Sequence, residues 1–316
     1  MPPPFLADAC GEVPMLDVVA YNTERHRRIG YLERFAGYFR QLGFTVEEHG
    51  QLAQADAASS RALIERVGTR EGWLADPEAH LRAAGCALTL VVGEDLPPGF
   101  GVVPPDPLRM LERYAQLHHD VRLFVGVDPH TPASLARALE CLGHPRAAGL
   151  AFSPYLACVP ISDAAWTPTL RAAHERQIPV WLHACAHFRA DVPYDIEHPR
   201  HADAVLSRFP ALRLVLGHAG WPWTADACVI ALRHPTTALE FATFPPSVLK
   251  DPGWSLTPLL AHRAALRGRV FFGSGATSSP GRFMRLVAQL DELELGQDLA
   301  LWRGQGLANW LTGDGA

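Results

Sequence analysis

Two histidines stand at the ends of short apolar runs in the second half of the chain. His183 closes the run Val180–His183, and His218 closes the run Leu214–His218. A lone histidine at the end of a strand is most often a hydrogen-bonded core residue. Two histidines on consecutive strands favour a metal site instead, because neutral imidazole is a common protein ligand for zinc and related ions.

The runs that carry these histidines belong to a pattern in which short apolar segments alternate with helical segments. This alternation is typical of βαβ units and a parallel sheet. Eight such units in series favour a distorted (β/α)8 barrel, in which the active site lies at the carboxyl ends of the strands. The expected strands are Leu6–Ala9, Ala87–Val92, Val121–Val127, Ala148–Phe152, Pro179–His183, Arg213–His218, Thr237–Ala242 and Val270–Gly273.

A long segment, at about residues 11–85, separates the first two expected strands and is interpreted as a helical insertion. Apolar residues at helical spacing predict an amphipathic helix there, packed on the barrel, with a lid or an oligomer contact as the alternative. These residues are His26, Ile29, Leu32, Phe35, Phe39 and Leu42. A further helix over Gln297–Leu311 is expected on the outside of the barrel. No linker divides residues 1–316, so we expect a single barrel domain.

Composition restricts the classes of partner. The 316 residues hold 28 basic and 33 acidic side chains, a net charge of −5, without basic runs, which argues against nucleic acid. The apolar runs are too short to span a bilayer, and the first residues lack the pattern of a signal peptide. Six cysteines without a C-x-x-C pair indicate reduced thiols. We therefore expect a cytoplasmic protein that binds neither nucleic acid nor membranes.

Five motifs resemble the amidohydrolase-related family, in the branch of the amidohydrolase superfamily that includes aminocarboxymuconate-semialdehyde-type decarboxylases. In the first half, only the strand within Leu6–Glu12 has a counterpart. The resemblance implies an amidohydrolase-type TIM barrel that forms homo- or hetero-oligomers. The motifs are Gly149–Tyr155, Ile178–His183, Phe209–Gly220, Val270–Ser274 and Leu307–Asn309.

The resemblance also implies a set of metal ligands. Members of this family typically hold a divalent metal with an HxH pair after the first strand, a histidine after the fifth, a histidine after the sixth and an aspartate after the eighth. His183 and His218 match the fifth and sixth strands, whereas the HxH pair falls at Cys10 and Glu12 and the aspartate falls at Gly275. A glycine neither binds metal nor takes a proton from metal-bound water, so a ligand and the general base are both missing.

Further departures fall on the fourth strand, where the lysine and histidine of G-x-K-x-H-P versions are replaced by Ala151 and Ser153. Glu240, at the end of the seventh strand, could supply the lost carboxylate or could equally be a buried glutamate paired to an arginine.

Three interpretations of the remaining site stay open. Glu12, His183 and His218 could hold one divalent ion of zinc, iron or manganese, with Cys10 as a further soft ligand that favours zinc. Alternatively, the site is empty and the two histidines are hydrogen-bonded core groups. In the third interpretation, a reduced metal centre supports non-hydrolytic chemistry with a base from a loop.

Two functions follow from these interpretations. The favoured hypothesis is a catalytically impaired or accessory subunit that assembles with an intact metal-dependent relative. The alternative is a mononuclear metal-dependent hydrolase or decarboxylase that acts on a small organic acid or amide.

Overall fold

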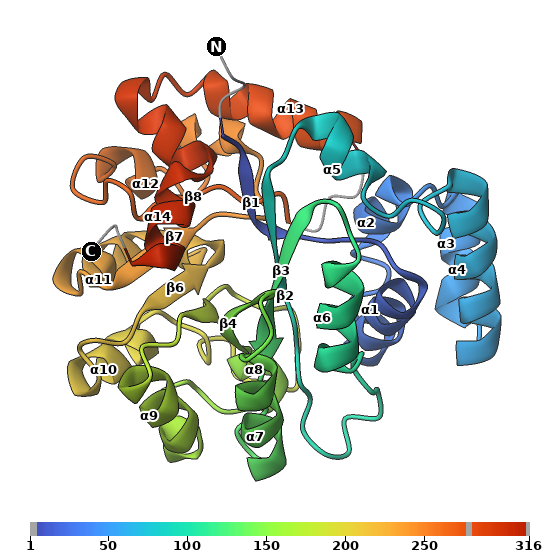
Figure 1. Cartoon of the computed structure of the whole chain (residues 1–316), viewed down its shortest axis with the longest axis horizontal. Coiled ribbons are helices and arrows are strands. Elements are labelled where there is room, and N and C mark those ends of the chain that lie inside the picture. Colours follow the sequence, from blue (N-terminus) through green and yellow to red (C-terminus); the bar gives the residue numbers. More distant parts are fainter. Residues whose placement is uncertain (1–4, 276–279, 314–316) are drawn as a thin grey trace.

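Eight parallel strands form the centre of the protein, in a computed structural model that describes residues 5–275 and 280–313. Each strand pairs with the next one along the chain, from the first to the eighth (Figure 1). All eight expected strands are confirmed, with each end within two residues of its expected position. They are β1 (Ala7–Gly11), β2 (Leu88–Val92), β3 (Asp120–Gly126), β4 (Ala147–Phe152), β5 (Val180–His183), β6 (Leu214–Gly217), β7 (Thr237–Glu240) and β8 (Val270–Phe271).

Backbone hydrogen bonds beyond the end of β8 join the last strand to the first. The amide of Ala9 donates to the carbonyl of Phe272 at 2.9 Å, and the amide of Gly275 donates to the carbonyl of Cys10 at 2.9 Å. The sheet therefore curls into a nearly closed barrel, which confirms the predicted (β/α)8 class.

Helices follow the strands and cover the outside of the barrel. Asp106 caps one of these helices, since its side chain accepts the Arg109 amide at 2.9 Å and Pro107 begins the helix. The helices are α1 (Leu16–Arg28), α2 (Ala36–Gln41), α3 (Val46–Gln54), α4 (Ala57–Glu71), α5 (Ala79–Ala84), α6 (Pro107–Ala115), α7 (Pro132–Cys141), α8 (Pro154–Ala157), α9 (Thr167–Glu175), α10 (Arg200–Arg208), α11 (Thr224–Arg233), α12 (Pro258–Ala261), α13 (Pro280–Asp291) and α14 (Gly306–Thr312).

The segment between β1 and β2 is helical, as expected, but its amphipathic helix is interrupted. α1 ends at Arg28 and α2 begins at Ala36, with Gly30 between them in the left-handed conformation at φ +73°. Glycine adopts this conformation at little cost, so the chain turns there. Most of the expected apolar side chains are still buried, and Leu32 and Phe39 pack with α3 and α4 in a cluster of their own. In Figure 1, α1 to α4 lie on one side of the strands, opposite α9 to α12.

Alternate residues of the strands fill the barrel interior, among them Phe124, Trp181 and Phe271. α14 adds Leu307 and Trp310 to this interior cluster, and the rings of Phe271 and Trp310 are 5.9 Å apart. α14 therefore covers the amino-terminal end of the barrel, and the expected place on the outside is wrong. The opposite end is left for the site. No helix in the described part of the chain has the length and apolar character that a membrane crossing requires.

Candidate functional site

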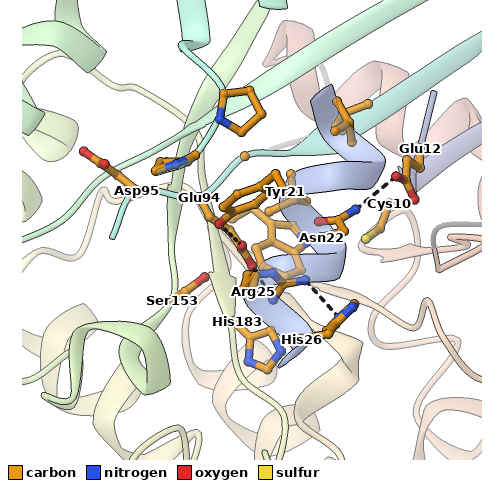
Figure 2. Close-up of a pocket in the computed structure, with 18 of the residues that line it drawn as sticks. Cys10, Glu12, Tyr21, Asn22, Arg25, His26, Glu94, Asp95, Ser153 and His183 are labelled. Atoms are coloured by element: carbon orange, nitrogen blue, oxygen red, sulfur yellow. Dashed lines mark hydrogen bonds and ion pairs between the residues drawn. The ribbon is translucent and has the colours of Figure 1, made fainter. Parts of the chain in front are cut away.

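A cavity of about 520 Å³ lies at the carboxyl ends of the strands, between the barrel and helix α1 (Figure 2). Most of the positions that the sequence selected line this cavity. Ala151 does not, because it lies deeper, in the barrel interior. The lining residues among those positions are Cys10, Glu12, Ser153, His183, His218 and Gly275.

His183 and His218 are neighbours in the cavity wall. Their ring centroids are 4.9 Å apart with planes at 72°, and both rings contact Trp181 below them. Nδ1 of His183 lies 2.8 Å from Oε2 of Glu197, and Nδ1 of His218 lies 3.3 Å from the carbonyl oxygen of Ala242. These contacts fix the rings and leave both Nε2 atoms for another partner, as in metal-binding histidines.

Burial keeps both imidazoles uncharged at neutral pH. It lowers the pKa of His183 to about 4 and that of His218 to about 3. Burial also raises the pKa of the Glu197 carboxyl well above its ordinary value. The site therefore presents two neutral imidazoles, the form in which histidine binds metal.

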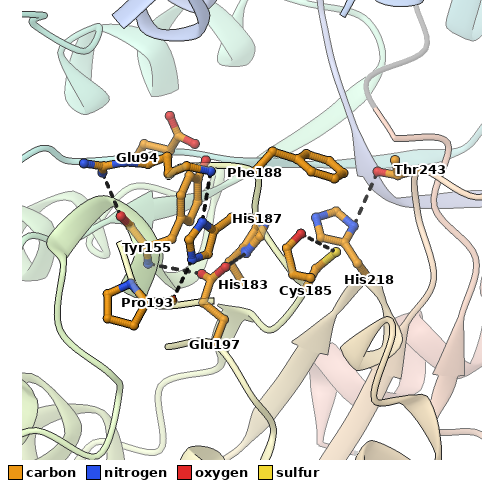
Figure 3. Close-up of polar contacts among 12 residues, drawn as sticks. Glu94, Tyr155, His183, Cys185, His187, Phe188, Pro193, Glu197, His218 and Thr243 are labelled. Atoms are coloured by element: carbon orange, nitrogen blue, oxygen red, sulfur yellow. Dashed lines mark hydrogen bonds and ion pairs between the residues drawn. The ribbon is translucent and has the colours of Figure 1, made fainter. Parts of the chain in front are cut away.

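Glu197 is a site residue that no motif in the sequence marked. It lies in the loop between β5 and α10, fully enclosed, and its Oε1 accepts the amide of Tyr155 at 3.3 Å (Figure 3). The sequence shows only that an acidic residue lies in the loop after the fifth strand. The spacing does not distinguish Glu197 from the neighbouring Asp195.

The insertion, through α1 and α2, holds the carboxyl group of Glu12. Its Oε1 accepts hydrogen bonds from the Tyr38 hydroxyl at 2.8 Å and from the Asn22 amide at 3.1 Å. Its Oε2 is buried and has no hydrogen-bond partner among the described residues. Burial raises the pKa of Glu12 to about 7.

The donor groups present do not make a three-ligand metal centre. No three histidine, cysteine, aspartate or glutamate side chains within residues 5–275 and 280–313 are placed to hold a metal ion. The structure brings His183 and His218 together but does not group Glu12 with them, and Figure 2 shows the carboxyl group of Glu12 beside Asn22, away from His183. The two imidazoles are suitable metal ligands, but no third ligand among the described residues is placed beside them. The assignment of Glu12, His183 and His218 as ligands stays a prediction.

Gly275 is held in a backbone conformation that other residues rarely adopt. Its φ is +69°, and a Cβ atom at this position would lie 2.4 Å from the amide nitrogen of Thr243. An aspartate there would need the backbone of Thr243 to move as well as a strained φ. The local backbone therefore leaves no room for the family's aspartate at this position.

Glu240 does not replace that carboxylate in the cavity wall. It is completely buried and is not among the residues that line the cavity. Its oxygens accept the backbone amides of His218, at 3.3 Å, and Ala242. Burial raises its pKa to about 8. The Glu240 carboxyl group therefore stabilises the turn that follows β6 by accepting backbone amides.

A buried ion pair lies beside the histidines and was also unmarked in the sequence. Arg25 on α1 contacts Glu94, after β2, at 3.0 Å, and the Tyr21 hydroxyl donates to Glu94 at 2.6 Å (Figure 2). Arg25 also donates to the Tyr155 hydroxyl at 3.0 Å, and the Tyr155 ring lies 4.8 Å from that of His183. This network links the insertion to the barrel.

Comparison with known proteins identifies the family. Residues 102–277, more than half of the chain, match the family described as amidohydrolase. No curated protein matches the sequence.

Solved structures share the fold at low sequence identity. A TIM-barrel protein from Bordetella bronchiseptica, described as uncharacterized, is 18% identical at a TM-score of 0.65, over 98% of this chain and 99% of that one. A 5-carboxyvanillate decarboxylase from Sphingomonas paucimobilis is 16% identical at a TM-score of 0.60, over 97% and 98%.

A second 5-carboxyvanillate decarboxylase, from Novosphingobium aromaticivorans, was solved with manganese and 4-hydroxy-3-methoxy-5-nitrobenzoic acid. It is 11% identical at a TM-score of 0.58, over 98% and 96%. Together with the eight-stranded barrel, the family match shows that this chain belongs to the amidohydrolase family.

Proposed function

We propose that this protein binds a small organic molecule in the cavity, and that the metal-dependent hydrolysis or decarboxylation of its family is impaired in it. The observation that carries this proposal is the packing of Gly275 against Thr243, which replaces the carboxylate position with closely packed backbone. The cavity beside this position is nevertheless kept.

The polar groups around the cavity support a binding role. Burying charged groups is costly unless they are paired, and a barrel kept only for assembly has no need of them at its carboxyl end. Here the Arg25–Glu94 ion pair adjoins the cavity. Pockets that combine apolar walls with a few buried polar groups are typical ligand sites.

The missing carboxylate supports impaired metal chemistry. A metal-bound water needs a nearby base to take its proton, and Gly275 offers none.

A binding screen and a turnover assay test both halves of this proposal. We expect the purified chain to bind members of a small-molecule library and to release no carbon dioxide from 5-carboxyvanillate, the substrate named for two structural neighbours, with manganese added. Turnover that depends on added metal would contradict the impairment, and an empty screen would contradict the binding role.

A second candidate function is a mononuclear metal-dependent hydrolase or decarboxylase. The Nε2 atoms of His183 and His218, which have no hydrogen-bond partner among the described residues, favour it, since they would hold the ion while Glu197 orients His183. Such an ion would polarise a substrate oxygen or activate water. Titration with Co²⁺, followed by visible absorption, tests it: the band should be lost in His218→Ala and kept in His187→Ala, a cavity histidine whose Nε2 already contacts the Pro193 carbonyl.

We also propose that the chain forms an oligomer with itself or with an intact family member. The resemblance to the family supports this proposal. Native mass spectrometry of the protein purified from its own cells tests it, and a monomer in complex with nothing else would contradict it.

A further inference from the structure

The charges around the cavity indicate which class of molecule it takes. Four carboxylates line the cavity, those of Glu12, Glu94, Asp95 and Asp106, against two guanidinium groups, those of Arg25 and Arg137. Four histidines also line the cavity, and a ring nitrogen of each already contacts a protein group. They are His26, His183, His187 and His218.

Both guanidinium groups already have a carboxylate partner. Arg25 pairs with Glu94 at 3.0 Å, and Arg137 pairs with Asp95 at 2.7 Å. Arg25 donates in addition to the Tyr155 hydroxyl. An organic acid that entered the cavity would find no unpaired cation among the described lining residues. It would have to displace Glu94 or Asp95 and leave that carboxylate without its partner.

The carboxylate of Glu12 has neutral hydrogen-bond partners, whereas those of Glu94 and Asp95 each contact a guanidinium group. Glu12 is 4% exposed, and the two groups that donate to its Oε1, on Tyr38 and Asn22, are neutral. Its Oε2 has no hydrogen-bond partner in the described part of the chain. Burial disfavours a carboxylate whose hydrogen-bond partners are neutral, and a cation bound beside it in the cavity would stabilise its charged form.

Aromatic rings make up much of the surrounding wall, including those of Tyr21, Phe35, Tyr38, Tyr155 and Trp181. The faces of such rings attract cations and give no advantage to anions. The walls and the carboxylates therefore favour the same kind of ligand.

We propose that the cavity selects an organic cation, an amine or amidine on an aromatic or apolar body, and that Glu12 is its counter-ion. This inference rests on the proposed binding role of the cavity and narrows it. It differs from the expectation of a small organic acid or amide.

Three probes of nearly identical shape test the charge preference: benzamidine, benzamide and benzoate. Isothermal titration of the full chain at neutral pH should show the tightest binding for benzamidine and the weakest for benzoate. Equal or tighter binding of benzoate would overturn the cation preference while leaving the binding role intact. If none of the three binds, both proposals fail for molecules of this size.

Two variants assign the preference to named residues. Glu12→Gln keeps the shape and removes the charge, so benzamidine should weaken by roughly tenfold while benzamide is unchanged. Glu94→Gln removes the partner of Arg25 and should improve benzoate relative to benzamidine. This second variant keeps the test decisive if Glu12→Gln folds poorly. Glu112→Gln, on the exposed side of α6, is the matched control. Unchanged relative affinities in both cavity variants would overturn the proposal.

Discussion

Nδ1 of His183 lies 2.8 Å from Oε2 of Glu197, so a loop carboxyl fixes a histidine that ends a barrel strand. The same carboxyl accepts the amide of Tyr155, after β4. Glu197 thus connects three segments at the carboxyl end of the barrel: the end of β4, the end of β5 and the loop that follows β5.

Removal of this carboxyl should destabilise the fold. In Glu197→Ala, the ring of His183 and the amide of Tyr155 lose their partner while buried, which costs about 1–3 kcal/mol for each unsatisfied group. Urea denaturation should show a lower free energy of unfolding, with a smaller loss in Glu197→Gln. Glu175→Ala, on an exposed part of α9, is the control. Equal stability of Glu197→Ala and the control would show that the contact adds nothing.

Restoring the family aspartate in Gly275→Asp should destabilise the protein and fail to create a metal site. The substitution combines a left-handed φ with a clash against Thr243. Gly99→Asp is a matched control, because Gly99 also has a positive φ, at +85°, but no atom within 4 Å of its Cβ position. The left-handed conformation alone costs about 1–2 kcal/mol. Thermal unfolding should show a larger loss for Gly275→Asp than for Gly99→Asp, and equal losses would mean that the clash relaxes freely.

Eight strands and the place of the site were predictable from the sequence, because strand length and spacing are local properties of the apolar pattern. His183 and His218 end consecutive strands, and barrel topology alone puts them side by side. Glu197 and Arg25 were not predictable, since a loop and an interrupted helix set their directions. The turn at Gly30 breaks the helical spacing on which the expected single helix depended. Helix α14 covers the barrel end because Trp310 packs into the barrel interior. The spacing of apolar residues in the sequence does not predict this tertiary contact.

The Arg25–Glu94 ion pair should matter for stability as a pair. Arg25→Met leaves a largely buried Glu94 without its cation, and breaking a buried pair on one side costs about 3–5 kcal/mol. Because the two side chains are 12% and 15% exposed, we expect the lower end of this range. The double variant Arg25→Met/Glu94→Leu should recover part of the loss in a urea titration. If the loss of unfolding free energy in the double variant equals the sum of the losses in the two single variants, the two residues do not interact.

Stability should fall as the pH rises, in part because of Glu240. Burial raises its pKa from 4.5 to about 8, so the folded state keeps this proton to higher pH than the unfolded state does. Its contribution is fully present below pH 4.5 and is lost as the pH rises towards 8. A tenfold difference in proton affinity between the folded and unfolded states corresponds to about 1.4 kcal/mol of stability.

Glu240→Gln, which cannot ionise, should therefore weaken the pH dependence of the unfolding free energy between pH 5 and pH 8. Glu112→Gln should leave this dependence as it is in the unchanged protein. A slope that is the same in all three proteins would show that Glu240 is already ionised in the folded state.

Metal content tests most directly the proposal that the barrel keeps its cavity but holds no metal ion there, because no three potential ligands among the described residues are placed around one point. Elemental analysis of the folded protein, after dialysis against zinc, iron or manganese and removal of the free ion, should find far less than one ion per chain. About one tightly held ion per chain, lost in Glu12→Ala or His218→Ala, would contradict the claim and establish Glu12, His183 and His218 as a working metal site.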